Sequence, residues 1–428
     1  MRRSALPATA VVLGLALTAC GGHDSTDKAS AGGDRTLTVW QMDGDLSPQA
    51  VAAINKRFEK ATGAKVKVEI QEWNNINTKI STALAQDDPP DVVEIGNTDV
   101  PLFAATGALT DITSHRSDLA AGQSWLAGLT GPATVDGKLY AAPLFAGNRA
   151  VIYNKEIWRK AGVTKPPATY AQLTADLDKV KAAHPSADFS AFYFPGKYWY
   201  GALQFVWDAG GRIAVKSGGQ WQGALSGAEA QAGIARWKHF QNTYSTPASR
   251  NVDTTAPDQS AVFAHGKASA VLDTSVNKIL KDNPSMKDKL GTFPFPSASG
   301  SGNQPVFLGG SDLAIAARGR HQDLALAYLK TATDPSVQAS VIVGIDHWTP
   351  VSTQIIDRTQ AGLPALSKAF TTAAKKSVAT PASPGWATVE SDQSINTLFA
   401  DVATGRKTPA AAAKGFDTHL DQALNAAQ

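Results

Sequence analysis

Several Trp and Tyr residues of this sequence stand next to carboxylate, amide or guanidinium side chains, outside its regular hydrophobic patterns. A flat aromatic ring packs well against a flat apolar face of a ligand. Asp, Glu, Asn, Gln and Arg carry planar groups that form hydrogen bonds with hydroxyls. A sugar presents both an apolar C–H face and hydroxyls, so these combinations are typical of a sugar-binding site.

The first candidates follow three predicted strands, at residues 37–40, 66–70 and 91–96. These segments are short, and they are either continuously apolar or alternate between apolar and polar residues. In α/β proteins, ligands bind beyond the carboxyl ends of the strands. The candidates from this part of the chain are Trp40, Asp43, Glu72, Trp73 and Asn97.

Other roles remain open for some of these residues. Trp40 is equally well explained as a core residue, and Asp43 could serve as a turn residue. Asp99 is a weaker candidate than Asn97, because an Asp before Val-Pro is well suited to cap a helix. For Trp73 we favour a place in the binding site, since a Trp beside a carboxylate is rarely left in solvent.

The later part of the chain adds further candidates. Residues 190–221 are rich in aromatic side chains, and Lys197 and Tyr198 predict a polar loop there, which favours Trp199 as a ring that stacks on the ligand. At least one ring of this group is expected in the core, and Asp312 could instead belong to a strand edge. The candidates are Trp199, Tyr200, Asp208, Asp273 at the end of a predicted strand, Gly310 with its bare backbone, Asp312 and Trp348.

The elements that must position these residues alternate along the chain. Ser47 and Pro48 open a helix, apolar residues recur within it at helical spacing, and Gly63 ends it. The order strand, helix, strand, helix, strand predicts an α/β fold with a largely parallel sheet. We further predict strands at 150–153, 268–272 and 306–316, helices at 78–86, 155–161, 169–183, 228–244, 322–331 and 409–428, and a loop at 291–302.

Composition limits the classes of function. The 428 residues allow two or three domains of about 100–200 residues each. The net charge of +3, without any Lys/Arg run, argues against a nucleic-acid partner. The eight His residues are scattered, so neither a metal site nor a cofactor is predicted.

The N-terminus combines Arg2 and Arg3, a short apolar stretch and the only cysteine, Cys20. This pattern predicts a signal peptide at 1–19, followed by a flexible tether at 20–34. Residues 17–21, which read LTACG, resemble the lipobox of bacterial lipoproteins. The resemblance implies that Cys20 is acylated and anchors the chain to the cell membrane from outside. The alternative is an ordinary signal peptide with an incidental cysteine.

Four stretches, in order, resemble motifs of extracellular solute-binding proteins of sugar-type ABC transporters, the maltose-binding-protein-like family 1. They are residues 58–63, 89–98, 136–143 and 263–268, which read FEKATG, PPDVVEIGNT, DGKLYAAP and FAHGKA. The resemblance implies a two-lobed periplasmic-binding-protein-like fold of type II, with the ligand in the cleft between the lobes and a hinge that closes on it. Lobe 1 is expected to comprise 35–147 and 275–345, and lobe 2 to comprise 148–274 and 346–428.

The same resemblance implies a monomeric, non-enzymatic protein that delivers a sugar to the permease subunits of an ABC importer. The loop that contains Phe145, Asn148 and Arg149 is then expected to cross between the lobes at the site. Arg149 could instead hold a salt bridge between the lobes. Residues 145–149 and 198–200 look closest to binders of disaccharides or of chitobiose-like sugars.

Three other functions remain open. A secreted carbohydrate-active enzyme needs two carboxylates at a defined separation, and sequence spacing does not exclude such a pair among Glu72, Asp208 and Asp273. No catalytic motif supports this reading. A binding protein for a polyamine would need clustered carboxylates, and a scaffold lipoprotein would not need the two-lobe motifs.

Overall fold

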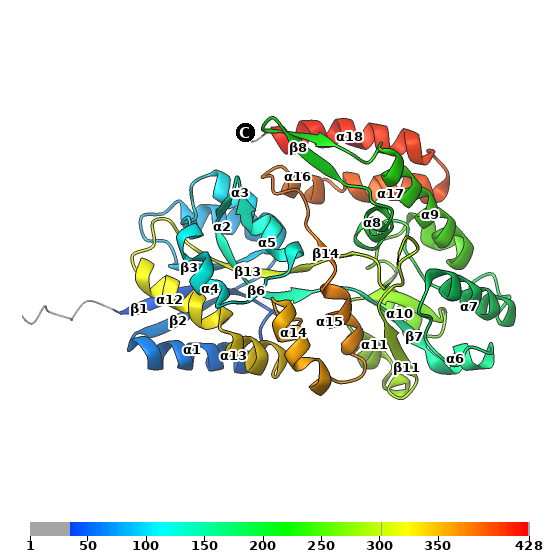
Figure 1. Cartoon of the computed structure of the whole chain (residues 1–428), viewed down its shortest axis with the longest axis horizontal. Coiled ribbons are helices and arrows are strands. Elements are labelled where there is room, and N and C mark those ends of the chain that lie inside the picture. Colours follow the sequence, from blue (N-terminus) through cyan, green and yellow to red (C-terminus); the bar gives the residue numbers. More distant parts are fainter. Residues whose placement is uncertain (1–34, 301, 427–428) are drawn as a thin grey trace, which may run out of the picture. The chain divides into compact units, whose positions relative to one another are not determined.

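The computed structural model describes residues 35–300 and 302–426. The predicted signal peptide (1–19), the tether (20–34) and Cys20 lie outside the described residues. From Thr36 onward the chain forms one unit by its contacts, and this unit contains two main β-sheets (Figure 1). No helix of the described part has the length and the apolar character needed to cross a membrane.

The first sheet has the strand order β2-β1-β3-β13-β6. β1 runs parallel to both β2 and β3, as predicted. β13 is antiparallel to β3 and to β6, so the sheet is mixed rather than largely parallel. The strands are β1 (Thr36–Met42), β2 (Lys65–Gln71), β3 (Val92–Gly96), β6 (Ala141–Gly147) and β13 (Gly309–Ile315).

Helix α1 (Pro48–Thr62) begins and ends where the sequence predicts it. Ser47 caps its N-terminus through a side-chain hydrogen bond, and Gly63 ends it with φ of 70°. Phe58 packs against Tyr328 of α12 (Gln322–Thr333) with 5.4 Å between ring centroids, which ties α1 to the core of the first lobe. The other helices around this sheet are α2 (Ile76–Leu84), η1 (Asn97–Asp99), α3 (Val100–Ala105), α4 (Arg116–Ala120), α5 (Ala127–Ala133), α12 (Gln322–Thr333) and α13 (Pro335–Val337).

The second sheet has three antiparallel strands in the order β10-β7-β11. They are β7 (Ala150–Asn154), β10 (Ala270–Asp273) and β11 (Leu290–Phe293). The expected assignment of 275–345 to lobe 1 is therefore wrong at its start, because β11 pairs with β7 in the second sheet. The predicted loop at 291–302 likewise begins inside a strand.

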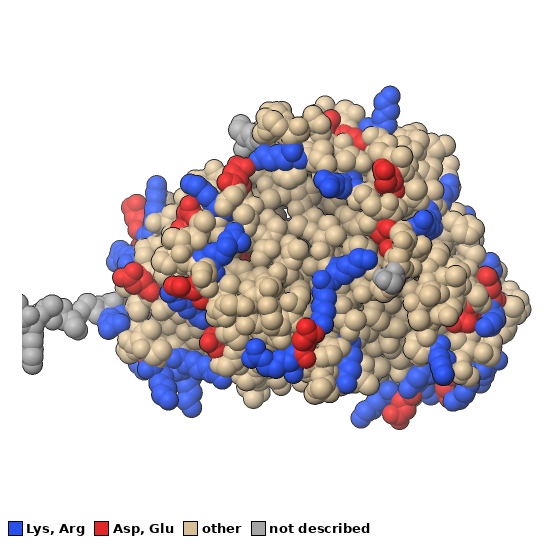
Figure 2. All heavy atoms as spheres, in the orientation of Figure 1, with Lys and Arg blue, Asp and Glu red and all other residues tan. Residues whose placement is uncertain are grey.

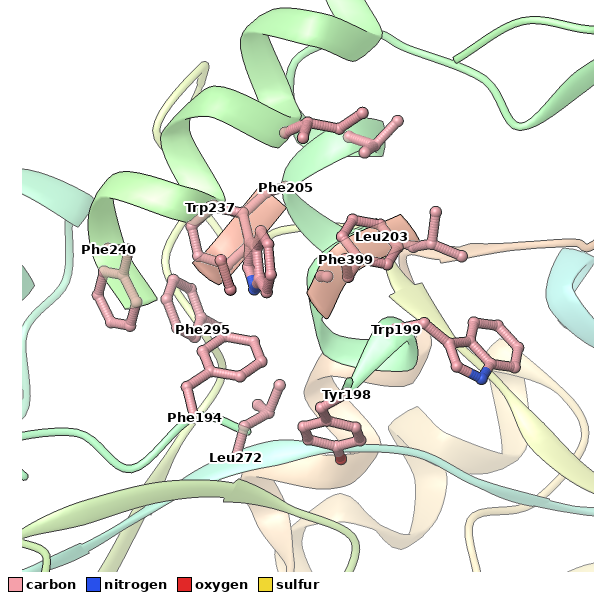
Figure 3. Packing of buried hydrophobic residues seen from close by; sticks show 14 of the residues in the cluster. Phe194, Tyr198, Trp199, Leu203, Phe205, Trp237, Phe240, Leu272, Phe295 and Phe399 are labelled. Atoms are coloured by element: carbon pink, nitrogen blue, oxygen red, sulfur yellow. The ribbon is translucent and has the colours of Figure 1, made fainter. Parts of the chain in front are cut away.

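The core of the second lobe contains a large group of aromatic rings (Figure 3). Phe194, Phe205, Trp237, Phe240 and Phe399 come from helices and loops far apart in the sequence and pack together there. The surrounding helices are α6 (Lys155–Lys160), α7 (Tyr170–Ala183), α8 (Trp199–Asp208), α9 (Ala228–Tyr244), α10 (Gln259–Ala264), α11 (Asn277–Asp282), α16 (Trp386–Ser391), α17 (Ser394–Thr404) and α18 (Pro409–Asn425).

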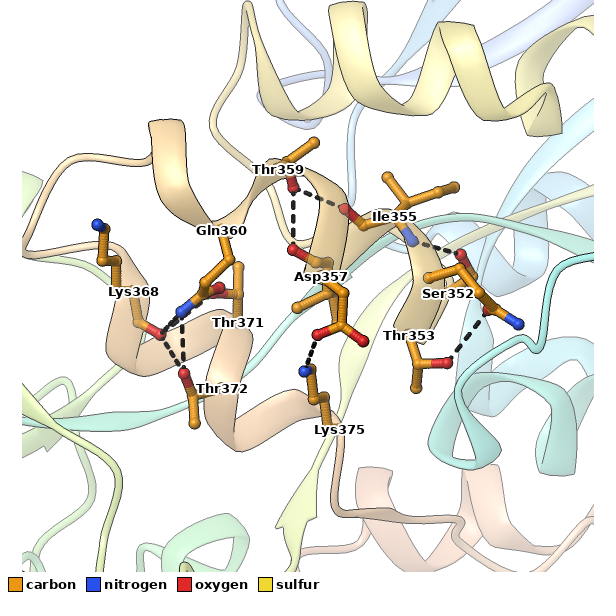
Figure 4. Close-up of polar contacts among 12 residues, drawn as sticks. Ser352, Thr353, Ile355, Asp357, Thr359, Gln360, Lys368, Thr371, Thr372 and Lys375 are labelled. Carbon is orange, nitrogen blue, oxygen red and sulfur yellow. Dashed lines mark hydrogen bonds and ion pairs between the residues drawn. The ribbon is translucent and has the colours of Figure 1, made fainter.

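The chain passes between the two sheets after β6, after β11 and again after α13. The last passage contains α14 (Thr353–Thr359) and α15 (Lys368–Ala374), whose polar contacts are drawn in Figure 4. Gln360 binds Thr371 and Thr372, and Lys375 forms an ion pair with Asp357. The short strands are β12 (Val306–Phe307) with β14 (Ser377–Val378), β4 (Thr134–Val135) with β5 (Lys138–Leu139), and β8 (Ala214–Ser217) with β9 (Gln220–Gly223).

Candidate functional site

The two lobes meet where η1, just after β3, faces α16 of the second lobe. Thr98 of η1 donates a hydrogen bond of 3.0 Å from its hydroxyl to the carboxylate of Glu390 on α16. The face shown in Figure 2 is hollowed in the area between α3 and α8. Most of the charged side chains on this face lie toward its edge. We call the contact region of η1, α8 and α16 the seam.

Arg149 lies at the seam among aromatic side chains. Its Nε donates a hydrogen bond of 2.9 Å to the hydroxyl of Tyr198, and its guanidinium lies 4.3 Å from the ring centroid of Tyr200. Phe307 lies on another side of the guanidinium, at 5.6 Å. Within the described chain Arg149 forms no ion pair, so its contacts favour a site residue over the alternative of a salt bridge between the lobes. A planar cation held in this way can present its remaining N–H groups to a ligand.

Two carboxylates face each other across the seam. Burial raises the pKa of Asp99 to about 6, and a hydrogen bond from the amide of Asn77 opposes this shift. Burial, with a further contribution from the nearby Asp99, raises the pKa of Glu390 to about 7. Both groups also raise the pKa of the Tyr200 hydroxyl, after its own burial. The seam therefore joins two acidic groups to an aromatic ring.

Trp73 is the most exposed Trp that contributes to this region. Its side chain is 41% exposed, and its ring approaches Gly96 on the same side as the Asp99 carboxylate. It extends the seam toward solvent and stays a predicted stacking ring. Glu72 beside it is exposed.

Trp348 borders a cavity of about 280 Å³ that is also lined by Asn148 and Thr274. Its indole stacks on Phe145 with 4.8 Å between centroids, and its Nε1 donates to the carbonyl of Asp45 at 2.9 Å. Asn148 and Thr274 are the chain neighbours of Arg149 and Asp273, but neither Arg149 nor Asp273 lines this cavity. A second hollow, of about 700 Å³, is also lined by Trp348 and includes the exposed Asp43.

Three predicted site residues are buried inside the fold instead, and two of them, Asn97 and Asp208, form hydrogen bonds there. Asn97 is 3% exposed and donates to the carbonyl of Leu308 at 3.0 Å. Asp208 ends α8 and accepts hydrogen bonds from the Ser297 hydroxyl and from a neighbouring backbone N–H. Asp312 is fully buried in β13, where burial raises its pKa well above the ordinary range. We leave these three out of the proposed site.

The expectation that Trp199 lies in a polar loop is wrong. Trp199 is the first residue of α8, is 4% exposed, and packs near Trp386 with 6.0 Å between centroids. Trp40 lies within β1 and donates from its indole to Glu69 on β2. Both rings therefore have packing roles, whereas Tyr200, one residue further along, reaches Arg149.

Asp273 lies at a strand end, as expected, and Gly310 lies inside the predicted strand at 306–316. Asp273 ends β10 and accepts a hydrogen bond of 2.6 Å from the Ser260 hydroxyl, while burial raises its pKa. Gly310 lies at the start of β13, opposite Ala146 of β6, and contributes only backbone.

The sequence reasoning missed Glu390 and Trp386, and it ranked Asp99 below Asn97. The Asp99 side chain forms no cap hydrogen bond for α3 and instead points to the seam. One signal was available: Trp386 and Glu390 are four residues apart, just after the Pro- and Gly-containing residues 381–385. Such spacing places both on one face of a helix.

Comparison with known proteins adds independent findings. A family model described as bacterial extracellular solute-binding protein matches residues 43–339. The "Diacetylchitobiose binding protein DasA" of Streptomyces coelicolor is 35% identical over 432 residues, which cover 99% of each chain. A "Maltooligosaccharide ABC transporter solute-binding lipoprotein" of Streptococcus pneumoniae is 26% identical over 286 residues, 64% of this chain and 63% of that one.

Solved structures show the same fold. The sugar-binding protein MalE of Xanthomonas citri has a TM-score of 0.77 at 24% identity, covering 91% of this chain and 97% of that one. A cyclo/maltodextrin-binding protein solved with maltotetraose has a TM-score of 0.77 at 20% identity, covering 92% and 98%. The two-lobed, type II binding-protein fold expected from the sequence is thereby confirmed.

Proposed function

Because the chain belongs to the family of bacterial extracellular solute-binding proteins, we propose that it captures a short oligosaccharide outside the cell and delivers it to an ABC importer. The observation that carries the proposal is the seam, where the aromatic ring of Tyr200, the guanidinium of Arg149 and the carboxylate of Glu390 lie together between the lobes. These groups match the apolar face and the hydroxyls of a sugar.

For the ligand we propose a chitobiose-like disaccharide. The support is the similarity over almost the full length to a protein named for binding diacetylchitobiose. Trp73 and Tyr200 supply rings, Arg149 supplies hydrogen-bond donors, and Asp99 and Glu390 supply acceptors. Asp43, Glu72, Phe145, Asn148 and Trp348 remain predicted residues at or beside this site.

Isothermal titration calorimetry with a sugar panel tests the proposal. We expect diacetylchitobiose to bind with a one-to-one stoichiometry, and maltose to bind more weakly. At about 100 times its dissociation constant, the ligand should add about 2.7 kcal/mol to the free energy of unfolding. The absence of binding to every sugar of the panel would overturn the proposal.

The variant Trp73→Ala tests, in the same experiment, whether the Trp73 ring contacts the sugar. A stacking ring acts as a binding hot spot, so its loss should weaken sugar binding more than about tenfold. Since the ring is 41% exposed, the melting temperature should change little.

If the protein were a carbohydrate-active enzyme, it would cleave the sugars with which it is incubated in the binding experiment. The relatives found are solute-binding proteins, and we assign no catalytic residue. Sugars recovered after incubation should be intact by chromatography, whereas cleaved products would favour the enzyme.

We further propose that Cys20 is lipidated and anchors the protein to the outer face of the cell membrane, with the ABC permease subunits as partners. Support comes from the LTACG motif and from the lipoprotein name of one relative. Replacing Cys20 with Ala should release the protein into the medium or leave it uncleaved, as measured by fractionation and mass spectrometry. Normal cleavage with retained membrane attachment would contradict the anchor.

A further inference from the structure

A hollow of about 380 Å³ lies in the second lobe, apart from the sugar site proposed above. Its walls come from the end of α8 and the loop after it, from the β8–β9 hairpin, and from residues 378–381 at the end of β14 and beyond. None of the residues proposed for the seam is among the described residues that line it. The volume falls within the range of small-molecule sites, about 300–1,000 Å³, so the lining residues decide which ligand fits.

Two indole rings, those of Trp207 and Trp221, line this hollow. Trp207 lies on the last turn of α8, and the half-buried Trp221 lies on β9. The backbone N–H and the carbonyl of Trp221 each form a hydrogen bond of 2.8 Å with the side chain of Asn425 on α18, beside the hairpin (Figure 1). Because the helix and the hairpin hold the two rings in place, they form a preorganised surface for a flat apolar face of a ligand.

Two polar side-chain atoms of the lining residues lack a partner. Nε1 of Trp221 and the hydroxyl oxygen of Thr380 are buried, and neither forms a hydrogen bond within the described chain. Arg212 borders the same hollow, is exposed, and forms no ion pair with any described residue. Buried polar groups are nearly always hydrogen-bonded, so two unpartnered groups beside one hollow point to a ligand that supplies their partners.

We propose that this hollow is a second binding site, which takes a single neutral sugar ring. The indoles of Trp207 and Trp221 pack against the C–H face of the ring, and Trp221 Nε1, the Thr380 hydroxyl and the Arg212 guanidinium bind its hydroxyls. Among the described residues that line the hollow there is no Asp or Glu, and Arg212 is the only charged one. A cationic ligand, such as an amino sugar with a free amine or a polyamine, is therefore disfavoured.

Nuclear magnetic resonance of the indole N–H groups tests this site. The full chain with isotope-labelled tryptophan is titrated with N-acetylglucosamine, and the Trp221 signal is assigned by its loss in Trp221→Phe. We expect this signal to move with a dissociation constant of about 1 mM, as suits so small a ligand. The Trp125 signal, from an indole of the first lobe whose Nε1 is also buried without a partner in the described chain, should stay in place. The Trp73 signal reports the seam separately.

Variants show whether the movement arises in the hollow. Arg212→Gln should raise the dissociation constant read at Trp221 about tenfold, because it removes the charged donor. Thr380→Val keeps the shape of the side chain and removes the hydroxyl, and it should raise the same constant about fivefold. Neither variant should change the affinity read at Trp73. Thr388→Val, at an exposed threonine of α16, is the matched control and should change neither value.

Four results would overturn the proposal. The Trp221 signal could stay in place at N-acetylglucosamine concentrations far above the expected constant. Its movement could be the same in Arg212→Gln and Thr380→Val as in the wild type, which would show that the sugar acts from the seam. Glucosamine could bind as tightly as N-acetylglucosamine, which would contradict the selection against cations. Indole could move the signal while sugars do not, which would assign the hollow to aromatic ligands.

Discussion

Replacing Arg149 with Met is expected to weaken binding of the chitobiose-like sugar about 100-fold, or by about 2.8 kcal/mol. The guanidinium lies 4.3 Å from the Tyr200 ring and has no carboxylate partner in the described chain, so its free N–H groups are available to the ligand. Met retains much of the apolar stem and removes the charge and the donors. Calorimetry measures the affinity, and thermal melting separates this loss from unfolding.

Two further variants sharpen this result. Arg149→Lys keeps the charge but loses the planar fork, so it should recover only part of the affinity. Arg57→Met removes an exposed arginine whose hydrogen bonds within the described residues go to serine hydroxyls, and this variant should bind sugar like the wild type. Wild-type affinity in Arg149→Met would remove Arg149 from the site and reopen a purely structural role for it.

Replacing Gly310 with Ala is expected to lower the free energy of unfolding by about 3 kcal/mol or more. Gly310 has φ of 134°, a region that side chains disfavour, and a Cβ there would lie 2.2 Å from the carbonyl oxygen of Phe145. Neither backbone can move without breaking the pairing of β13 with β6. Urea unfolding monitored by circular dichroism measures the effect.

Gly415→Ala is the matched control for this substitution. Gly415 lies inside α18, and a Cβ there would meet nothing within 4 Å. Removing a helical glycine should leave stability unchanged or raise it by about 1 kcal/mol. If both variants unfold at the same urea concentration, the contact at Gly310 is not a constraint on the sheet.

Several of the longer elements of this fold could be predicted from local sequence. Ser47, Pro48 and Gly63 marked the ends of α1, and the apolar segments that became β1, β2 and β3 were short and well bounded. These signals depend on neighbouring residues alone. The pairing of β13 with β3 and of β11 with β7 depends on residues far along the chain, and no local pattern encodes it.

The site was harder to predict for the same reason. The sequence identified residues near strand ends, and Tyr200 and Arg149 do meet at the seam. It could not tell which of two neighbouring rings faces the seam (Tyr200) and which packs in the core (Trp199), because a helix turns each residue by about 100°. Glu390 was missed because its importance arises from Asp99, which lies almost 300 positions earlier.

The position of β13 has a consequence for how this chain becomes folded. β13 is an inner strand of the first sheet, between β3 and β6, yet residues 148–308 separate it from β6 in the sequence. When the chain emerges N-terminus first, β1, β2, β3 and β6 are therefore all present long before β13 emerges. Until then β6 has no strand through which it can pair with the other three. Such late, distant pairing closes slowly. For a protein of an extracytoplasmic family, the topology itself delays folding of the first lobe until nearly three quarters of the chain has passed the translocation channel.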